Sequence, residues 1–208
     1  MYSADELLQW LQNWIYSNYK KNPRNKTRVQ IMTIDNPGWG VTIDRISHLP
    51  NKNLPLADAT NSEDNWYYCT IKDSKFEGDG GLFNLADIFR IFKQLVNYDD
   101  TKNYFIKSQK IRINDDLTWL LQWFVNQCDG DWEHGNGIKI GTIDNPGWHL
   151  KVSLYDTELE KKDFQIVDIS RAEHDWIYCA IKDAQFQGFG GLYNLPEILS
   201  TFRNWAES

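Results

Sequence analysis

Apolar residues recur at helical spacing near the start of the chain and again just past its middle. In the first stretch Leu7 and Leu11 share one face, and in the second Leu117 and Leu121 do so. Spacings of three and four residues place side chains on the same side of an α-helix. We therefore predict a helix at each place, with Asn114 as the N-cap of the second.

Period-two alternation follows each predicted helix and indicates strands with one buried face. Residues 29–33 and 39–43 alternate around an Asn-Pro-Gly sequence at 36–38, and the same arrangement recurs over 138–154. Proline presets the first central position of a type II turn, and glycine accepts the positive φ of the second. Each half is therefore predicted to contain a hairpin closed by a type II turn.

Two later strands are predicted at 66–71 and 176–181, where both faces are apolar or aromatic. That composition favours central strands covered on both sides. The glycine-rich segments that follow, at 78–81 and 188–191, are expected to turn the chain into a final helix in each half. Neither segment fits the Walker A or dinucleotide-binding pattern, so a phosphate-binding loop is disfavoured.

The two halves are copies of one sequence. A shift of 109 residues superposes segment 33–39 on 142–148 without a gap, and after one inserted residue Trp66 aligns with Trp176. Most tryptophans form such matched pairs on apolar stripes, and we expect those pairs to pack in the core.

The expected fold class is α+β, with two tandem α-β-β-(β)-β-α repeats related by a pseudo-twofold axis. Each repeat would pack its helices on a mostly antiparallel sheet, and the strand in parentheses is a short one near 164–167 in the second repeat. The first repeat spans 1–96 and the second spans 115–208. The connector at 97–114 contains a stretch that fits an edge strand.

Charge is distributed unevenly between the repeats. Residues 1–96 hold 11 Lys/Arg and 11 Asp/Glu, residues 97–114 hold 4 and 2, and residues 115–208 hold 7 and 16. The acidic second repeat disfavours nucleic acid and anionic membranes as partners and favours a basic protein or a cation. No signal peptide or bilayer-spanning run is recognisable, and three cysteines form no disulfide framework, so a cytoplasmic location is expected.

One segment distinguishes the repeats. The second contains Cys128-Asp-Gly-Asp-Trp-Glu-His134, whereas the first has Tyr19-Lys-Lys-Asn-Pro-Arg-Asn25 at the matching place. An aromatic side chain such as Trp132 in a Gly- and Asp-rich loop is typical of a contact residue. The segment is therefore where the two repeats are expected to differ in function.

The same segment invites two chemical interpretations, and both are disfavoured. Cys128 with His134 as its base would form a nucleophile, but a helix C-terminus and neighbouring carboxylates raise a thiol's pKa. The acidic residues resemble part of a cation site, but the EF-hand pattern and the His and Cys spacings typical of transition metals are missing. We therefore predict no catalytic residue, no metal site and no cofactor.

Several motifs of the second repeat together resemble the immunity protein 53 family. They are Gln127 to His134, Ile140 to Trp148, Trp176 to Cys179 and Gly190 to Leu195. The resemblance spans residues 114–206, and the first repeat resembles the family over 5–96 without the Trp-Glu-His sequence. Members of this family are small bacterial α+β proteins encoded beside toxins in polymorphic toxin systems.

The resemblance implies a non-enzymatic protein that binds and neutralises a toxin acting inside the producing cell. A nuclease toxin is basic where it holds nucleic acid, and an acidic inhibitor complements it. On this interpretation the acidic side chains meet Lys or Arg of the toxin and Trp132 anchors the contact. The predicted partner-binding residues are Asp129, Asp131, Trp132, Glu133, His134, Asp144 and Asn145.

Other interpretations stay open at this point. The family signature can equally maintain the fold, and the oligomeric state is not specified. One alternative function is a metal- or cysteine-dependent hydrolase centred on Cys128 to His134. Another is a ligand-binding module that uses exposed aromatic side chains.

Overall fold

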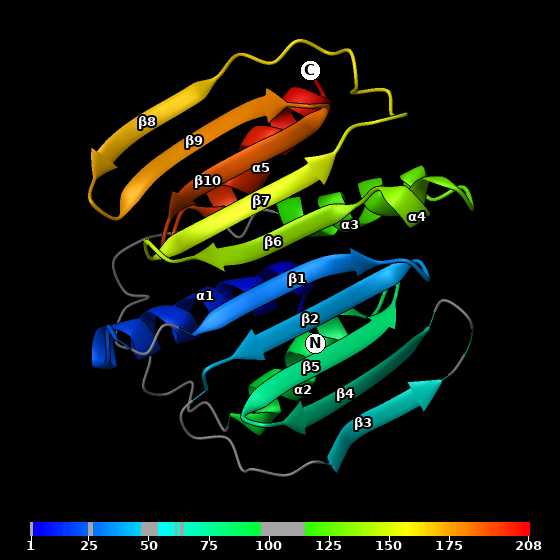
Figure 1. Ribbon diagram of the computed structural model, residues 1–208, viewed down its shortest axis with the longest axis vertical. Helices are drawn as coiled ribbons and strands as arrows, with labels where there is room; N and C mark the ends of the chain where they lie inside the picture. The colour runs from blue at the N-terminus through cyan, green and yellow to red at the C-terminus, as the bar shows by residue number, and fades with distance from the viewer. Residues whose placement is uncertain (1, 25–26, 47–53, 61, 63–64, 97–114) are drawn as a thin grey trace.

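A computed structural model describes residues 2–24, 27–46, 54–60, 62, 65–96 and 115–208. These residues form one ten-stranded sheet in the order β3-β4-β5-β2-β1-β6-β7-β10-β9-β8, with every neighbouring pair antiparallel. The long helices all lie on one side of the sheet, behind the strands in the view of Figure 1.

The bounds of the elements follow the two repeats. The first repeat contains α1 (Ala4–Lys21), β1 (Arg28–Ile34), β2 (Gly38–Asp44), β3 (Leu54–Thr60), β4 (Trp66–Lys72), β5 (Lys75–Gly81) and α2 (Leu85–Leu95). The second contains α3 (Asp116–Gln127), α4 (Trp132–Gly135), β6 (Ile138–Ile143), β7 (Gly147–Ser153), β8 (Val167–Ala172), β9 (Asp175–Lys182), β10 (Gln185–Gly191) and α5 (Leu195–Ala206). The predicted α+β class and tandem repeat are confirmed.

The glycine-rich segments were wrongly predicted to be turns. They form β5 and β10, so the described residues of each repeat include five strands. A Cβ on Gly78 would lie 2.5 Å from Ile88 Cγ2, and one on Gly188 would lie 2.3 Å from Ile198 Cγ2. Glycine is therefore required because the last helix of each repeat packs directly on these strands.

The hairpins are confirmed, but the reason for the glycine after each proline differs from the prediction. Neither Gly38 nor Gly147 has a positive φ, so neither occupies the second central position of a type II turn. A Cβ on Gly38 would lie 2.3 Å from the Gly80 carbonyl oxygen, and one on Gly147 would lie 2.2 Å from that of Gly190. The glycines permit close approach of neighbouring strands.

The strands β4 and β9 are not covered on both faces, contrary to expectation. Cys69 and Cys179 point toward the helices and are fully buried, whereas Tyr68 and Tyr178 on the opposite face are 42% and 38% exposed. Aromatic residues on the face opposite the helices made the sequences of these strands resemble those of strands covered on both faces.

The repeats join through β1 and β6, where Ile31 pairs with its own counterpart, Ile140. Two equivalent hydrogen bonds flank this pair: the N–H of Ile138 donates to Thr33 Oγ1 and that of Val29 to Thr142 Oγ1, each at 3.0 Å. This reciprocity is the signature of a pseudo-twofold axis.

A second junction lies on the helical side. Asp5 of the first repeat accepts hydrogen bonds from the N–H groups of Leu117 and Thr118, at 2.8 and 3.1 Å, at the start of α3. The cap position of α3 is Asp115, so the predicted N-cap one residue earlier was wrong, and the orphan N–H groups find their acceptor in the other repeat. Asn114 itself, and the connector expected to form an edge strand, lie outside the described residues.

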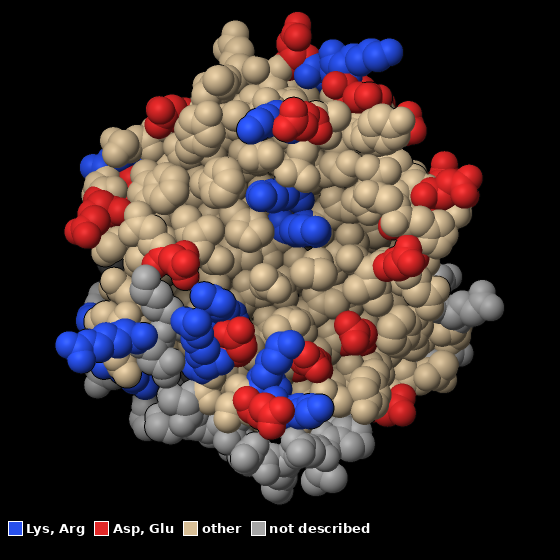
Figure 2. All heavy atoms as spheres, viewed as in Figure 1, with Lys and Arg blue, Asp and Glu red and all other residues tan. Residues whose placement is uncertain are grey.

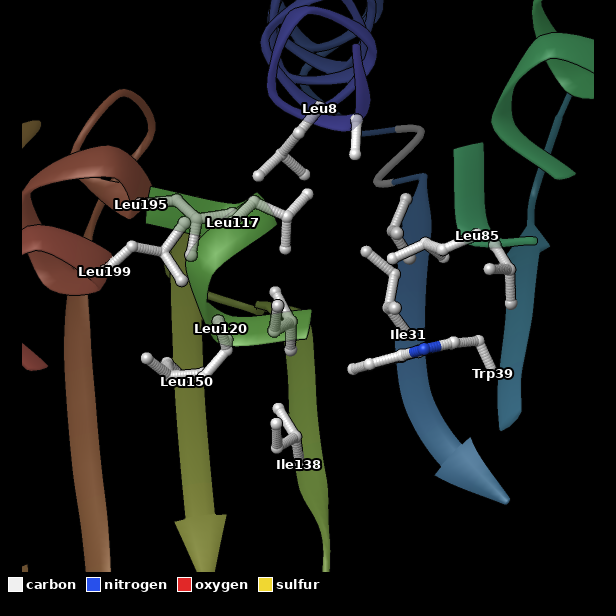
Figure 3. Packing of buried hydrophobic residues seen from close by; sticks show 14 of the residues in the cluster. Leu8, Ile31, Trp39, Leu85, Leu117, Leu120, Ile138, Leu150, Leu195 and Leu199 are labelled. Carbon is white, nitrogen blue, oxygen red and sulfur yellow. The ribbon is translucent and has the colours of Figure 1, made fainter. Parts of the chain in front are cut away.

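The core lies between the helices and one face of the sheet. In Figure 3, Leu117 and Leu120 of α3 and Leu199 of α5 extend toward Leu150 on the sheet, and Leu8 of α1 lies beside them. The core is thus continuous across both repeats. Within the described part of the chain, no helix is long and apolar enough to cross a membrane.

Candidate functional site

The segment after α3 folds by bonding to itself. Gly130 has a φ of +99°, which lets the chain reverse. The Asp129 carboxylate accepts from the N–H groups of Asp131 and Trp132, at 3.0 and 2.9 Å, and these bonds lower its pKa. The Glu133 carboxylate accepts from the N–H groups of Asp129 and Gly130, each at 3.1 Å. The loop is therefore a fixed structure in which two of its acids hold the backbone.

Trp132 lies inside the protein. Its side chain is 6% exposed, and its ring meets those of Trp123 and Phe124 at centroid distances of 6.1 Å. Its indole N–H donates to the carbonyl oxygen of Tyr155 at 2.7 Å. With Glu133 also only 7% exposed, these two predicted contact residues position the loop and present almost no surface themselves.

Asp129, Asp131 and His134 are exposed, and the structure brings a residue of the first repeat beside them. His134 Nδ1 lies 2.7 Å from Asp35 Oδ1, on the β1–β2 turn. The hydrogen bond and charge of Asp35 raise the pKa of His134 above its ordinary value. The loop of one repeat thus meets the Asp-Asn-Pro-Gly turn of the other.

Asp144 and Asn145 are exposed as well, but they lie at a different edge. They follow β6, whereas the loop at 128–135 precedes it, and a six-residue strand separates its ends by about 20 Å. Asp144 Oδ1 lies 3.8 Å from a guanidinium nitrogen of Arg28 in the first repeat. The structure therefore does not unite all the predicted contact residues in one cluster.

Further acids that the sequence did not single out lie next to the loop. The indole of Trp123 donates to Glu158 at 3.0 Å, and the bond from Trp132 fixes the neighbouring Tyr155. We use the term acidic edge for the exposed or half-exposed carboxylates brought together in this way: Asp129, Asp131, Asp156, Glu158 and Glu160. Figure 2 shows acidic side chains without basic ones along the right-hand edge, the side where Figure 1 places α4.

The carboxylates of the acidic edge are not paired with basic side chains of the described residues. Among the residues that the structure describes, none of these five carboxylates forms an ion pair with Lys or Arg. The sequence shows three acids over 156–160, but it does not show that they lie beside the loop, because that placement depends on the bond from Trp132 to Tyr155.

The matching place in the first repeat is built differently. There α1 continues to Lys21, and Tyr19 packs edge-on against His174 at a centroid distance of 6.4 Å. A cavity of about 30 Å³ lies against Ile15, Tyr19 and Trp148. The counterpart place beside Trp39 is filled by Phe124, whose ring lies 5.3 Å from that indole and also contacts Trp132.

The residues considered for catalysis are engaged elsewhere. The Cys128 thiol donates to the carbonyl oxygen of Phe124 at 3.3 Å, and burial with the charges of Glu133 and Asp129 raises its pKa to about 12. The proposed base, His134, is paired with Asp35. A search of the described residues finds no group of three or more His, Cys, Asp or Glu side chains arranged to hold a metal ion.

Comparison with known proteins gives a clear family assignment. The model of immunity protein 53 matches residues 8–97 and matches again at residues 117–207. The chain belongs to the immunity protein 53 family. Both immunity-protein repeats are therefore recognisable, including the first, which lacks the Trp-Glu-His sequence. No curated protein and no solved structure matches the chain significantly.

Proposed function

We propose that this immunity protein binds a cognate toxin through the acidic edge and neutralises it by forming a complex. Membership of the immunity protein 53 family is the observation that carries this proposal. The acidic edge supports it, because unpaired exposed carboxylates attract a basic partner and accelerate its association. The partner would be a protein whose contact surface is rich in Lys and Arg, as in a nuclease.

The predicted contact residues divide into two groups under this proposal. Asp129, Asp131 and His134 face solvent and would meet the toxin, with His134 held by Asp35 of the first repeat. Trp132 and Glu133 are buried and would act by fixing the loop that presents those side chains. The contact would therefore use both repeats, although only the second carries the complete sequence.

Asp144 and Asn145 would lie outside this contact, because β6 separates them from the loop. They supply a useful control, since their side chains are also exposed and belong to the same repeat. The action proposed is stoichiometric binding rather than turnover, in keeping with the raised pKa of the Cys128 thiol.

Co-expression with the toxin encoded beside the gene tests the proposal. The variant Asp131→Asn, Asp156→Asn, Glu158→Gln removes three charges while retaining side-chain shape, including the acceptor for Trp123. We expect it to bind the toxin at least about tenfold more weakly, chiefly through slower association at low salt. Protection of the cell should fall in parallel.

The matched control Asp144→Asn, Glu173→Gln, Asp183→Asn removes the same charge from other exposed positions. We expect toxin affinity within about twofold of the unmodified protein, because distant charges act only through the screened long-range field. Equal losses in both variants would remove the acidic edge from the proposal. Full protection and affinity in the first variant would do the same.

A further inference from the structure

The two most exposed aromatic side chains of the described residues are Phe83, at 63%, and Tyr155, at 54%. Phe83 lies in the turn between β5 and α2, and Tyr155 follows β7. Within the described part of the chain, neither ring packs against another aromatic ring. Single exposed apolar side chains are common on proteins, so the positions of these two rings decide what they indicate.

Both rings lie at the strand ends beside the loop at 128–135. The end of β5 pairs with the start of β2, through Gly81 and Gly38, and the start of β2 pairs with the end of β1. β1 runs antiparallel to β6, whose start pairs with the end of β7. In Figure 1 the arrowheads of β5, β1 and β7 accordingly point to the right, the side of α4. Four strand spacings separate β5 from β7, or about 19 Å.

Tyr155 adjoins one side of the loop. Its carbonyl oxygen accepts the indole N–H of Trp132 at 2.7 Å, and the acids at 156–160 follow it directly in the chain. This bond fixes the backbone of Tyr155 and leaves its ring on the surface. The ring is therefore held next to carboxylates of the acidic edge.

Phe83 adjoins the other side. The carbonyl oxygen of the preceding residue, Leu82, accepts the indole N–H of Trp39 at 3.2 Å, and that indole lies 5.3 Å from the ring of Phe124 on α3. The backbone before Phe83 is thus fixed against the helix that leads into the loop. The two exposed rings flank the loop, one from each repeat.

The residue equivalent to Phe83 in the second repeat is packed differently. Tyr193 occupies the matching turn, and its ring lies 4.9 Å from that of Tyr16 on α1, so its exposed fraction falls to 39%. The residue of α3 at the position of Tyr16 is Val125, which offers Phe83 no ring to pack against. The first repeat therefore leaves unpacked, beside the acidic edge, a ring that the second repeat packs against α1.

Charges and rings contribute differently to a protein complex. Complementary charges mainly accelerate association, and exposed ion pairs add little affinity. Aromatic anchors that fill pockets of the partner supply much of the binding free energy and act through the dissociation rate. The loop itself provides no such anchor, because Trp132 is buried within the protein. A standard interface covers about 800 Å² on each partner, roughly 30 Å across, so one partner can cover both flanking rings.

We propose that Phe83 and Tyr155 are the two aromatic anchors of the toxin contact. The toxin surface would have an apolar pocket on each side of a strip rich in Lys and Arg. This inference rests on the proposed function, because it assigns further residues to the same contact. The carboxylates of the acidic edge guide the toxin to the site, and the two rings hold it there.

Association and dissociation rates with the purified toxin encoded beside the gene test the two anchors. Phe83→Ala and Tyr155→Ala should each raise the dissociation rate at least about tenfold and leave the association rate within about twofold. The variant Asp131→Asn, Asp156→Asn, Glu158→Gln should do the opposite, with slower association at low salt and little change in dissociation. Surface plasmon resonance measures both rates.

Tyr193→Ala is the matched control, because it removes an exposed ring from the same turn at the opposite strand ends. Its dissociation rate should stay within about twofold of that of the unmodified protein. Tyr155→Phe retains the ring and should also dissociate at the unmodified rate. The urea midpoints of Phe83→Ala and Tyr155→Ala should match that of the unmodified protein, since both rings are exposed.

The outcomes separate this inference from the proposed function. Unchanged dissociation in either Phe83→Ala or Tyr155→Ala, together with slower association in the acidic-edge variant, overturns the pair of anchors and leaves the proposed function in place. Equal effects of Phe83→Ala and Tyr193→Ala also overturn the anchors. If the unmodified chain forms no complex with that toxin, the proposed function fails, and the anchors fail with it.

Discussion

The segment after the first helix of each repeat occupies the same place in the fold but has two different structures. In the first repeat α1 extends to Lys21, and this segment carries three basic residues, Lys20, Lys21 and Arg24. In the second repeat α3 ends at Gln127, and the chain folds back over Trp132. The two repeats share one fold, but this segment places basic side chains at one edge in the first repeat, whereas in the second it forms the acidic edge together with the acids at 156–160.

This difference shows how a buried residue can determine a surface. Trp132 joins the loop at 128–135 to the chain at Tyr155, and Trp123 holds Glu158 nearby. Acids distant in the sequence become neighbours because of these two indole bonds. The first repeat has Pro23 in place of Trp132, and its equivalent space beside Trp148 holds a small cavity.

Removing Trp132 should have the largest effect on the structural difference between the two segments. Trp132→Ala deletes a buried ring and the bond to Tyr155, and we expect the free energy of unfolding to fall by about 3–5 kcal/mol. Urea denaturation measures this value. Tyr155→Ala is the control, because that side chain is 54% exposed and only its carbonyl oxygen receives the bond. A loss below about 1 kcal/mol for Trp132→Ala contradicts a positioning role.

The reversal of the chain should be the next most sensitive feature. Gly130→Ala places a side chain at a φ of +99°, and such strain costs about 1–3 kcal/mol. Gly135→Ala is a matched control in the same segment, since a Cβ there meets nothing within 4 Å and its φ is not positive. Equal unfolding midpoints in urea for the two variants would show that the loop does not depend on this backbone conformation.

The contact between repeats at His134 should have the smallest effect, and it should depend on pH. Asp35 raises the folded-state pKa of His134 above its ordinary value of 6.5. The resulting stabilisation is present below that value and is lost as pH rises through the folded-state pKa. Asp35→Asn should therefore be less stable than the unmodified protein near pH 6 and equally stable near about pH 8.5.

Proton NMR titration of His134 measures the same coupling directly. In Asp35→Asn the pKa of His134 should move down toward its ordinary value, whereas in Asp144→Asn it should not change, because that residue lies at the other edge. If the pKa of His134 is unchanged in Asp35→Asn, the loop does not interact with the first repeat through this contact.

The sequence was sufficient for features that depend on local periodicity. The helices α1, α2, α3 and α5, the two hairpins and the repeat all follow from spacing that neighbouring residues reveal, and the family assignment follows from contiguous motifs. The strands β5 and β10 were missed because glycines carry no side chains to show alternation. Their glycines are required by Ile88 and Ile198 on helices that fold over them later in the chain.

The site was predictable only in part for a similar reason. The loop itself was found, but burial of Trp132 depends on Phe124 and on the carbonyl oxygen of Tyr155, which periodicity does not place beside it. The separation of Asp144 from the loop results from the length of β6, and the approach of Asp35 results from the antiparallel pairing of β1 with β6. The candidate contact surface of the second repeat therefore includes Asp35 of the first repeat, which the sequence did not indicate.

Hydrogen exchange of the complex with the cognate toxin is the most direct test of the acidic edge as the toxin contact. We predict that toxin slows exchange at residues 129–135, at 155–160 and at the turn around Asp35, and leaves the amides around Lys20 and Asp144 unchanged. Protection confined to the first repeat's basic edge, or to the turn at Asp144, would contradict the proposal.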